Sequence, residues 1–378
     1  MIMLSVSFAY ALTLEEAVSR AAEVDPNAVV AELEWKKAQL GAAESWVDLG
    51  PSPGVKATRV WSTGAVADRI TFESQLVSLS VPDWFLAGQA SATAGGAKWT
   101  AEATRLDAQY AAAALYESVI AAQAALAAAH ETQGFAESTV RASKARVAAG
   151  LESELIGRSA EISLLDAQAN TELAEAGVTI ASARLQRALQ MQIGTLEAPT
   201  RLTVPLDGGA SPWLRASAAA VTAAKLSHDA AIAGWLPTGG LSASTPLFQT
   251  DWQFAITGTW QFDGLIGPFL RERQTALDVK IARTQYDALH HDLDLGLLEA
   301  RANAGAAHRV AEAARARESL AKESVKVGQT RLEVGLASTL EVLRLQDDAG
   351  AAYFGRVQAE LNEALAVLEA RRVAGVAW

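Results

Sequence analysis

The sequence predicts a mostly helical fold with a small β part, in which long helical hairpins follow pairs of short strands. Three observations support this prediction. The chain of 378 residues is 50% hydrophobic but only 6% aromatic, because alanine, the best helix former, supplies much of its apolar content. Its ten prolines leave two long stretches, 83–198 and 269–378, without any, and a proline inside a helix costs about 3 kcal/mol. The same order of elements also occurs twice along the chain.

Each proline-free stretch is expected to break once, at Ala149-Gly150-Leu151 and at Val334-Gly335-Leu336. Glycine just past a helix end takes the left-handed conformation that closes the last turn. An arm such as 89–148 would then be about 90 Å long at 1.5 Å per residue. After the second break, nine mostly apolar or small residues recur at spacings of three and four, as in a coiled coil. They are Leu340, Leu343, Asp347, Gly350, Phe354, Val357, Leu361, Ala364 and Leu368. This seam requires a further helix, from the same chain or from a second copy.

Four stretches, 54–61, 71–81, 241–247 and 252–262, have strand character and are bounded by proline or glycine. Polar turns at 62–70 and 248–251 would join them in pairs. Tilted strands of about 9–11 residues suit a membrane β-barrel, whereas no stretch reads as a transmembrane helix. Tryptophans beside the strands suit a membrane interface; these are Trp61, Trp84, Trp252 and Trp260. A soluble β-layer with core tryptophans is the alternative.

The chain divides into two copies of one module. The segment 146–151 recurs as 331–336 about half a chain later, a period too long for a solenoid of short units. We therefore expect structural repeats at 12–194 and 213–378, joined by a linker at 195–212. Residues 1–11 end in Ala9-Tyr10-Ala11, which predicts a short or truncated export signal; an apolar tail on a cytosolic helix is the alternative.

Composition excludes several function classes. The absence of cysteine removes disulfides, thiolate metal sites and cysteine nucleophiles. The net charge of −11 disfavours nucleic acid as a partner, since phosphates attract Lys and Arg. The histidines have no metal-ligand spacing, and the sequence contains no phosphate-binding loop or nucleophile elbow. We therefore expect no catalytic residues, no cofactor, no metal and no enzymatic activity.

The order of elements resembles the TolC-type outer-membrane factor family, the outer membrane efflux proteins. The segments that carry the resemblance are Leu12–Val18 (LTLEEAV) with Asp25-Pro26-Asn27, Trp260–Gly264 (WQFDG), its looser copy 79–85, and the two turns at 146–156 and 331–343. Together they extend over nearly the whole chain. The chain departs from the family pattern in two respects. The sequence ends directly after its last expected helix, so we expect the C-terminal part of the family's equatorial belt to be missing. Its strands are also short.

The resemblance implies a homotrimer. Four strands cannot close a barrel, and lipid does not tolerate an open sheet edge, so three copies would share a 12-stranded membrane β-barrel above a periplasmic α-barrel. It also implies an outer-membrane location extending into the periplasm, and the role of a passive exit duct in a tripartite efflux or type I secretion system. The implied partners are outer-membrane lipid, a periplasmic adaptor and an inner-membrane transporter of the RND, ABC or MFS type. A soluble coiled-coil scaffold is the alternative function, and an envelope enzyme is a third.

The resemblance places one functional region at the two hairpin tips and another just beyond the second tip. The hairpin tips would dock the adaptor; these residues are Arg146, Gly150, Leu151, Arg331, Val334, Gly335 and Leu336. Alternatively, the two glycines only end helices. Glu341 stands where the family often has an acidic residue at the periplasmic entrance, but Arg344 replaces the second acid. The two residues could also form a simple i,i+3 pair on one helix face.

Overall fold

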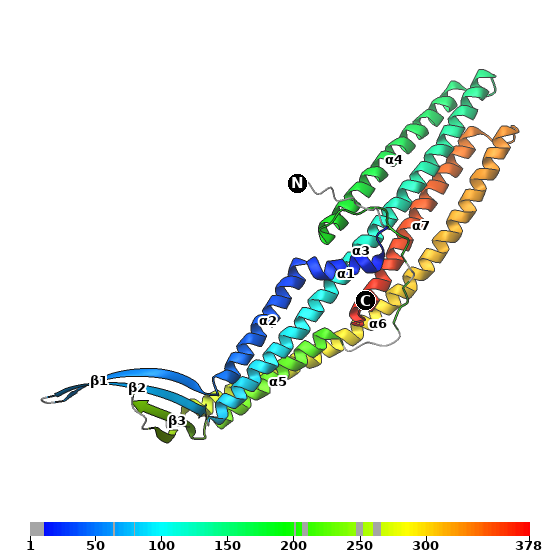
Figure 1. Cartoon of the computed structure of the whole chain (residues 1–378). Helices are drawn as coiled ribbons and strands as arrows, with labels where there is room; N and C mark the ends of the chain where they lie inside the picture. Colours follow the sequence, from blue (N-terminus) through cyan, green and yellow to red (C-terminus); the bar gives the residue numbers. More distant parts are fainter. Residues whose placement is uncertain are drawn as a thin grey trace, which may run out of the picture. The chain divides into compact units, whose positions relative to one another are not determined.

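The computed structural model describes residues 11–62, 65–78, 80–199, 202–205, 211–246, 252–259 and 266–378. The predicted export segment, apart from Ala11, and the predicted turn at 248–251 lie outside the described residues. The elements are α1 (Leu14–Val24), α2 (Pro26–Val47), β1 (Ser52–Ser62), β2 (Ala65–Ser78), α3 (Val81–Ala148), α4 (Glu154–Leu189), α5 (Pro212–Ala233), β3 (Thr238–Pro246), β4 (Gln253–Thr259), α6 (Ile266–Glu333) and α7 (Thr339–Val373) (Figure 1). The predicted mostly helical fold with four strands is confirmed.

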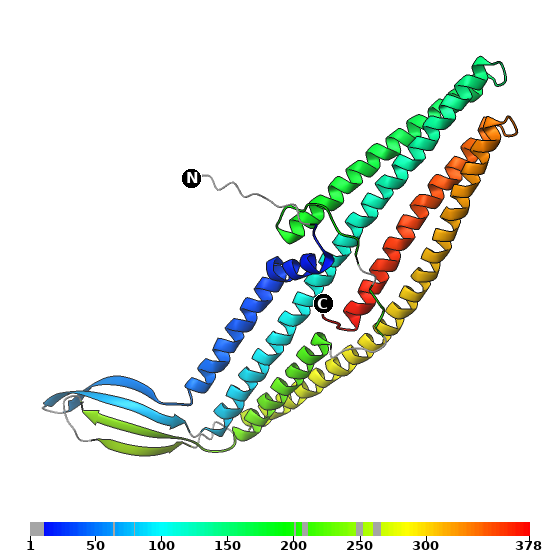
Figure 2. The same cartoon turned by 45° about the vertical axis from the view of Figure 1, so that its right-hand side comes forward.

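Two helices dominate the chain. Both α3 and α6 contain 68 residues, and each turns back into a shorter helix, α4 or α7, at the predicted glycine. Figure 2 shows the two hairpins, coloured green and orange. Alanine and the absence of internal proline explain their length, since neither helix has to bend around a missing amide hydrogen.

Contacts divide the chain into two units, each discontinuous in sequence. The first consists of Met1–Ala28, Arg105–Gly209 and Leu293–Trp378, and the second of Val29–Thr104 and Ala210–Asp292. Both long helices therefore contribute to both units. The division of the sequence into repeats at 12–194 and 213–378 stays a prediction.

Hydrogen bonds hold the start of α1 and the residue before it in place within the first unit. Thr13 and Glu16 form a capping box at the start of α1, in which each side chain accepts a hydrogen bond from the other's backbone. Leu12 forms an isolated parallel bridge with Leu196. The buried hydroxyl of Tyr116 on α3 lies 2.8 Å from the Leu12 carbonyl oxygen and 2.6 Å from that of Glu197. One α3 side chain thus holds both segments against the long helix.

The packing of α7 confirms part of the predicted seam, because Leu343, Gly350, Val357 and Leu368 are buried. A second stripe, shifted by one residue, is buried as well: Thr339, Val342, Gln346, Ala349 and Tyr353. Leu340 and Phe354 of the predicted seam are exposed in the single chain, and so is Asp347. Close approach explains the shift: a Cβ on Gly328 of α6 would lie 2.6 Å from Leu345 Cδ1, so the absent side chain lets α7 settle against α6.

Charged side chains join α6 to α7 further along the hairpin. Arg315 donates to Glu360 at 2.7 Å and to Glu363 at 2.8 Å, and Glu363 also pairs with His308 at 2.6 Å. Arg356 of α7 contacts Glu318 of α6. Apart from the exposed His308, these groups are only partly exposed, so their pairs are less screened by solvent than surface pairs.

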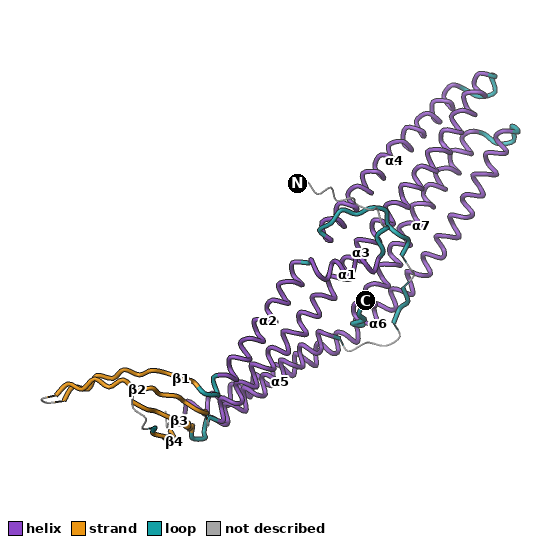
Figure 3. The backbone as a smooth tube through the Cα atoms, in the orientation of Figure 1, coloured by secondary structure: helices purple, strands orange, loops and turns teal. Residues whose placement is uncertain are grey.

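The second unit contains one antiparallel sheet in the order β1-β2-β3-β4 (Figure 3). β1 pairs with β2 from Ser52↔Gln75 to Ser62↔Ala65. The predicted turn at 62–70 is therefore wrong, because most of it continues β2, which has 14 residues. The expectation that the strands are short holds for β4, with seven residues, but fails for β2.

Small residues bring α5 against α3 in this second unit. A Cβ on Gly96 would lie 3.4 Å from Ala219 Cβ, and one on Gly88 would lie 3.6 Å from Leu226. The Arg215 guanidinium lies 4.4 Å from the centre of the Trp99 ring, within the range of a cation–π contact. The helices α3 and α5 are thus packed closely against each other.

One part of α3 is apolar enough and long enough to pass as a membrane-spanning helix by composition. This finding contradicts the expectation that no stretch would qualify. The helix is rich in alanine, and several of its apolar side chains, including Ala113, Tyr116 and Val119, are buried within the protein. Of the qualifying segment, 28% is buried within the structure, so the finding rests on length and composition alone.

Candidate functional site

The sheet has one polar and one apolar face. Side chains alternate between the faces of a strand, so the strand register assigns each residue to a face. One face carries Glu73 opposite Ser244, Gln75 opposite Ser242, and Thr257 opposite Gly240. The opposite face carries the apolar residues Phe72, Ala243, Phe254, Leu241 and Ile256, together with the small polar residues Ser74 and Thr245. This separation is the pattern of a strand with lipid on one side and water on the other.

The apolar face is open to its surroundings along β4, whereas Ala243 and Thr245 on the same face are buried. Phe254 is 69% exposed and Ile256 80%, although both are large and apolar. The ring of Trp252 meets that of Phe72 edge to face, with centroids 6.3 Å apart. A soluble protein seldom leaves a contiguous group of large apolar side chains in water, so this face requires a covering.

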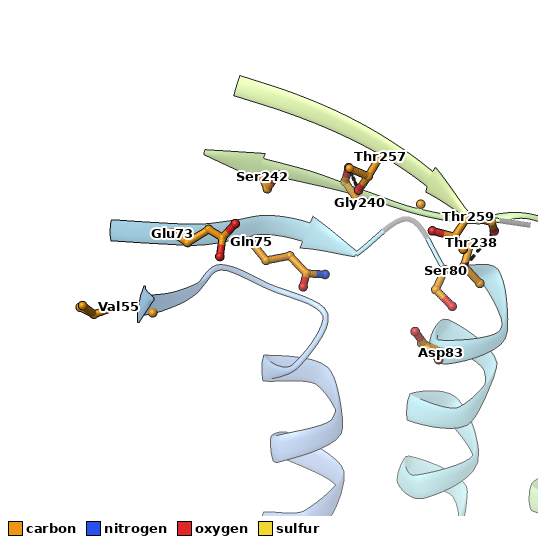
Figure 4. Close-up of a pocket in the computed structure, with 12 residues that line it drawn as sticks. Val55, Glu73, Gln75, Ser80, Asp83, Thr238, Gly240, Ser242, Thr257 and Thr259 are labelled. Atoms are coloured by element: carbon orange, nitrogen blue, oxygen red, sulfur yellow. Dashed lines mark hydrogen bonds between the residues drawn. The ribbon is translucent and has the colours of Figure 1, made fainter. Parts of the chain in front are cut away.

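The polar face forms a cleft of about 790 Å³. Figure 4 shows that its side chains come from the four strands and from the start of α3. The lining includes two acids, Glu73 and Asp83, together with hydroxyl and amide groups of Gln75, Ser80, Ser242, Thr238, Thr257 and Thr259. Such a surface binds water readily and is suited to face an aqueous passage.

The predicted interface tryptophans have different outcomes. Trp252 lies beside β4 and is 53% exposed. Trp84 lies in the first turn of α3, where its ring meets that of Trp46 edge to face at 6.1 Å, and Trp46 Nε1 donates to Ser91 Oγ at 2.8 Å. Trp61 is in β1, and Trp260 lies outside the described residues. Both described rings are thus near strand ends, and their place at a membrane interface stays a prediction.

The two hairpin tips have the same backbone geometry. Gly150 and Gly335 have φ of +71° and +76°, which few L-residues adopt. Leu151 N–H donates to the Arg146 carbonyl, and Leu336 N–H donates to the Arg331 carbonyl, each at 2.8 Å. This is the Schellman termination, which confirms both predicted breaks. Nothing lies within 4 Å of a Cβ built on either glycine, so both tips have free space beside them.

The apolar tip residues are exposed, but the two arginines are not equivalent. Leu151 is 68% exposed, Val334 65% and Leu336 77%. Arg331 is also exposed. Arg146 instead pairs with Glu152 at 2.9 Å and donates to the Leu332 carbonyl of the other hairpin at 3.1 Å. Arg146 therefore joins the hairpins, and Arg331 is the more available of the two for a partner.

Sequence reasoning missed Glu152 and Thr339. The Glu152 side chain is only 5% exposed, and its carboxylate lies 2.7 and 2.8 Å from the Thr339 hydroxyl. Glu152 directly follows the Gly-Leu of the first tip, whereas the second tip has Ala337 at the same position. A charged residue at a position that is small and apolar in the other repeat was the available signal.

The predicted entrance residues lie in the first turns of α7. Glu341 N–H donates to Ser338 Oγ at 3.2 Å, so Glu341 occupies the third position of the helix, where a negative charge favours the helix dipole. Arg344 is exposed. Among the described residues no ion pair joins the two side chains, so the simple i,i+3 pair is not formed in this structure.

Comparisons with known proteins agree with this arrangement. The family model described as outer membrane efflux protein matches residues 18–190. No curated protein matches the chain in sequence. A membrane protein from Pseudomonas aeruginosa matches with a TM-score of 0.83 and 19% identity, over 97% of this chain and 90% of that one.

Two further solved structures have the same fold. The outer membrane protein VceC from Vibrio cholerae has a TM-score of 0.82 and 16% identity, over 96% of each chain. The open state of the MtrE outer membrane channel from Neisseria gonorrhoeae has a TM-score of 0.83 and 18% identity, over 96% of this chain and 88% of that one. The resemblance to TolC-type channels is therefore confirmed. The family matched is one of outer-membrane channels and not of enzymes, in agreement with the predicted location and the predicted lack of catalysis.

Proposed function

Starting from the match to outer membrane efflux proteins, we propose that this chain is one subunit of a passive exit duct that conducts substrate across the outer membrane. The two-faced sheet is the observation that carries the proposal. Its apolar face, with Phe254 and Ile256 exposed, suits contact with lipid, and its polar cleft suits the inner wall of a water-filled passage.

The sheet edges support a homotrimer. β1 and β4 form the two outer edges of the four-stranded sheet described here. An unpaired edge within lipid leaves backbone N–H and C=O groups without partners, each at a cost of several kcal/mol. Pairing β1 of one copy with β4 of the next removes every edge. Three copies would then give a barrel of twelve strands.

The hairpin tips support docking of a partner in the periplasm. Each tip presents an exposed leucine beside a glycine with free space around it, so another protein's backbone can approach closely. We propose that a periplasmic adaptor docks there, principally at Arg331, Val334, Gly335 and Leu336, and at Gly150 and Leu151. Glu341 and Arg344 would face the entrance. The adaptor would connect the duct to an inner-membrane transporter of the RND, ABC or MFS type.

Fractionation, cross-linking and conductance together test the proposal. We expect the protein in the outer-membrane fraction, a trimer after cross-linking in detergent, and stepwise conductance when the purified protein is added to a planar lipid bilayer. A cytosolic protein that cross-links through its helices and gives no conductance would instead establish the alternative, a soluble coiled-coil scaffold.

A further inference from the structure

The four helices next to the sheet follow one another in the order α2-α3-α5-α6. Trp46 of α2 donates to Ser91 of α3 at 2.8 Å, and the close approach at Gly96 joins α3 to α5. His228 Nδ1 of α5 lies 3.0 Å from Thr275 Oγ1 of α6. The helices therefore have the same order as the strands β1-β2-β3-β4, and α2 and α6 are the outer two of the four (Figure 2).

Both outer helices carry a stripe of large apolar side chains that nothing in the chain covers. These side chains are more than half exposed; they are Leu33, Leu40 and Val47 of α2, and Leu270, Leu277 and Ile281 of α6. The residues of α2 recur every seven positions, and so do Leu270 and Leu277, which is the spacing of a seam between two helices. Leu277 is two residues beyond Thr275, so it lies about 200° around α6 from the contact with α5.

The connections to the sheet place the two stripes at matching heights. α2 ends at Val47 shortly before β1, and α6 begins at Ile266 shortly after β4. α2 thus runs toward the sheet and α6 runs away from it. If β1 of one copy pairs with β4 of the next, α2 and α6 of these copies become neighbours that run in opposite directions. Val47 is then level with Leu270, and Leu40 is level with Leu277.

Opposite charges lie within the two stripes. Glu44 is between Leu40 and Val47, Arg273 is between Leu270 and Leu277, and both charged side chains are exposed. In the part of the chain that the structure describes, neither side chain forms an ion pair. In the antiparallel arrangement Glu44 is level with Arg273, so the charges of the two surfaces are complementary.

We propose that the α2 stripe of one copy packs against the α6 stripe of the next copy, with Glu44 paired to Arg273. A second copy suits these stripes better than lipid does, because a charged side chain facing hydrocarbon is costly whereas each charge here meets an opposite one. The inference rests on the proposed trimer and extends the contact between copies from the edge strands to the helices beside them.

Paired cysteines test the contact, because the chain has no cysteine of its own. We expect mild oxidation of Leu40→Cys/Leu277→Cys to link the chains into dimers and trimers on a non-reducing denaturing gel. Leu33→Cys/Leu270→Cys is the matched control, since both of these positions are 59% exposed. They would lie about 21 Å apart along the seam at 1.5 Å per residue, whereas a disulfide requires Cα atoms within about 7 Å. The control should therefore stay monomeric on the gel.

Charge reversal tests the ion pair independently. Glu44→Arg and Arg273→Glu should each lower the ratio of trimer to monomer in detergent by about fivefold or more, because like charges then meet at every contact between copies. The double variant Glu44→Arg/Arg273→Glu should recover most of that ratio. A double variant that is no better than the single ones would overturn the assigned pair.

The outcomes separate this inference from the proposed duct. Equal linking of the two cysteine pairs, or a disulfide formed only within one chain, would overturn the helix contact. A trimer captured by a lysine-reactive reagent, without linking of Leu40→Cys/Leu277→Cys, would also overturn it but would leave the duct intact. If the unaltered chain forms no trimer with either reagent and gives no conductance, the proposed function fails together with this inference.

Discussion

The carboxylate of Glu152 lies 2.7 and 2.8 Å from the hydroxyl of Thr339, although the two residues are 187 positions apart in sequence. Glu152 follows the tip of the first hairpin, and Thr339 begins α7 after the tip of the second. Since Glu152 also pairs with Arg146, and Arg146 donates to the Leu332 carbonyl, one carboxylate organises the polar contacts between the two tips.

Replacing Glu152 should therefore loosen the hairpins from each other. Glu152→Gln removes the charge that holds Arg146 in a site where the carboxylate is 5% exposed. Breaking a buried pair costs about 3–5 kcal/mol, and we expect roughly 2–3 kcal/mol here because Arg146 is 21% exposed. Amide hydrogen exchange at the start of α7 should accelerate accordingly.

Glu154→Gln is the control for this prediction. Glu154 is 83% exposed and lies 3.8 Å from Arg158, so its replacement should leave exchange in α7 unchanged. If the two variants behave alike, the contacts of Glu152 do not hold the hairpins together.

Gly328 should be intolerant of a side chain because of Leu345. A Cβ at this position would lie 2.6 Å from Leu345 Cδ1, and overpacking a core costs about 1–3 kcal/mol. We expect Gly328→Leu to lower the free energy of unfolding by that amount, and Leu345→Ala in the same chain to restore part of it. Denaturant unfolding monitored by circular dichroism measures both.

Gly134 provides the opposite case on α3. Nothing lies within 4 Å of a Cβ built there, so Gly134→Ala should stabilise the helix by about 0.5–1 kcal/mol. A destabilised Gly134→Ala would show that helical glycines in this chain are required for a reason other than close packing at Gly328.

Local signals predicted the elements, but contacts between distant segments could not be predicted. The two glycine turns were predictable because proline-free stretches and a recurring tip sequence mark them directly. The turn expected at 62–70 was wrong because Asp68 and Arg69 look like turn residues, whereas their backbones pair with Arg59 and Thr58. Periodicity within α7 predicted four of its buried residues, but the burial of the neighbouring stripe depends on Gly328 of another helix.

The same contrast between local signals and long-range contacts applies to the candidate sites. The tip glycines and the strand tryptophans were recognised because each has a local pattern. The joining role of Arg146 was missed because its partners, Glu152 and the Leu332 carbonyl, come together only when the two hairpins pack. Gln346 lies in no motif, and its hydrogen bonds to the Phe135 carbonyl and to Thr139 form only when α7 packs against α3.

Acid should weaken the connection between α6 and α7 through Glu363. Burial pushes the pKa of Glu363 upward, but hydrogen bonds and charges from His308 and Arg315 outweigh burial and leave the pKa below its ordinary value. A carboxyl with a lowered pKa in the folded state stabilises the protein above its unfolded pKa, and this contribution is lost as the pH falls through the folded pKa. The relevant window therefore lies below about pH 4.5.

Comparing the chain with Glu363→Gln at several pH values isolates this contribution. The difference in the free energy of unfolding between the two proteins should shrink toward zero as the pH falls below about 4.5. A difference that grows as the pH falls would contradict the assigned direction of the pKa shift.

Gly335 should tolerate asparagine but not tryptophan if the tip docks a partner. Its φ of +76° suits asparagine better than most residues, so Gly335→Asn should fold with a cost of about 1 kcal/mol or less.

Gly335→Trp adds bulk in free space and should leave the trimer in the membrane while abolishing export in cells that carry the cognate pump. Leu361→Asp, which places a charge on α7, should instead reduce the yield of trimer. If Gly335→Trp exports normally and forms the full amount of trimer, Gly335 only ends the helix and the tip does not dock a partner.

The last prediction separates the two faces of the sheet with neighbouring residues. Ile256 is on the apolar face opposite Leu241, and Thr257 is on the polar face opposite Gly240. A lysine facing lipid costs about 2–4 kcal/mol near the middle of the bilayer and less toward its edges, whereas a lysine facing water costs little. We expect Ile256→Lys to fold poorly into lipid vesicles from urea, and Thr257→Lys to fold normally but to shift the ion selectivity of the conductance toward anions. Both variants add the same charge one residue apart, so net charge and strand position cannot explain a difference. Equal folding of the two variants would mean that lipid does not cover the apolar face, and the proposed membrane barrel would have to be abandoned.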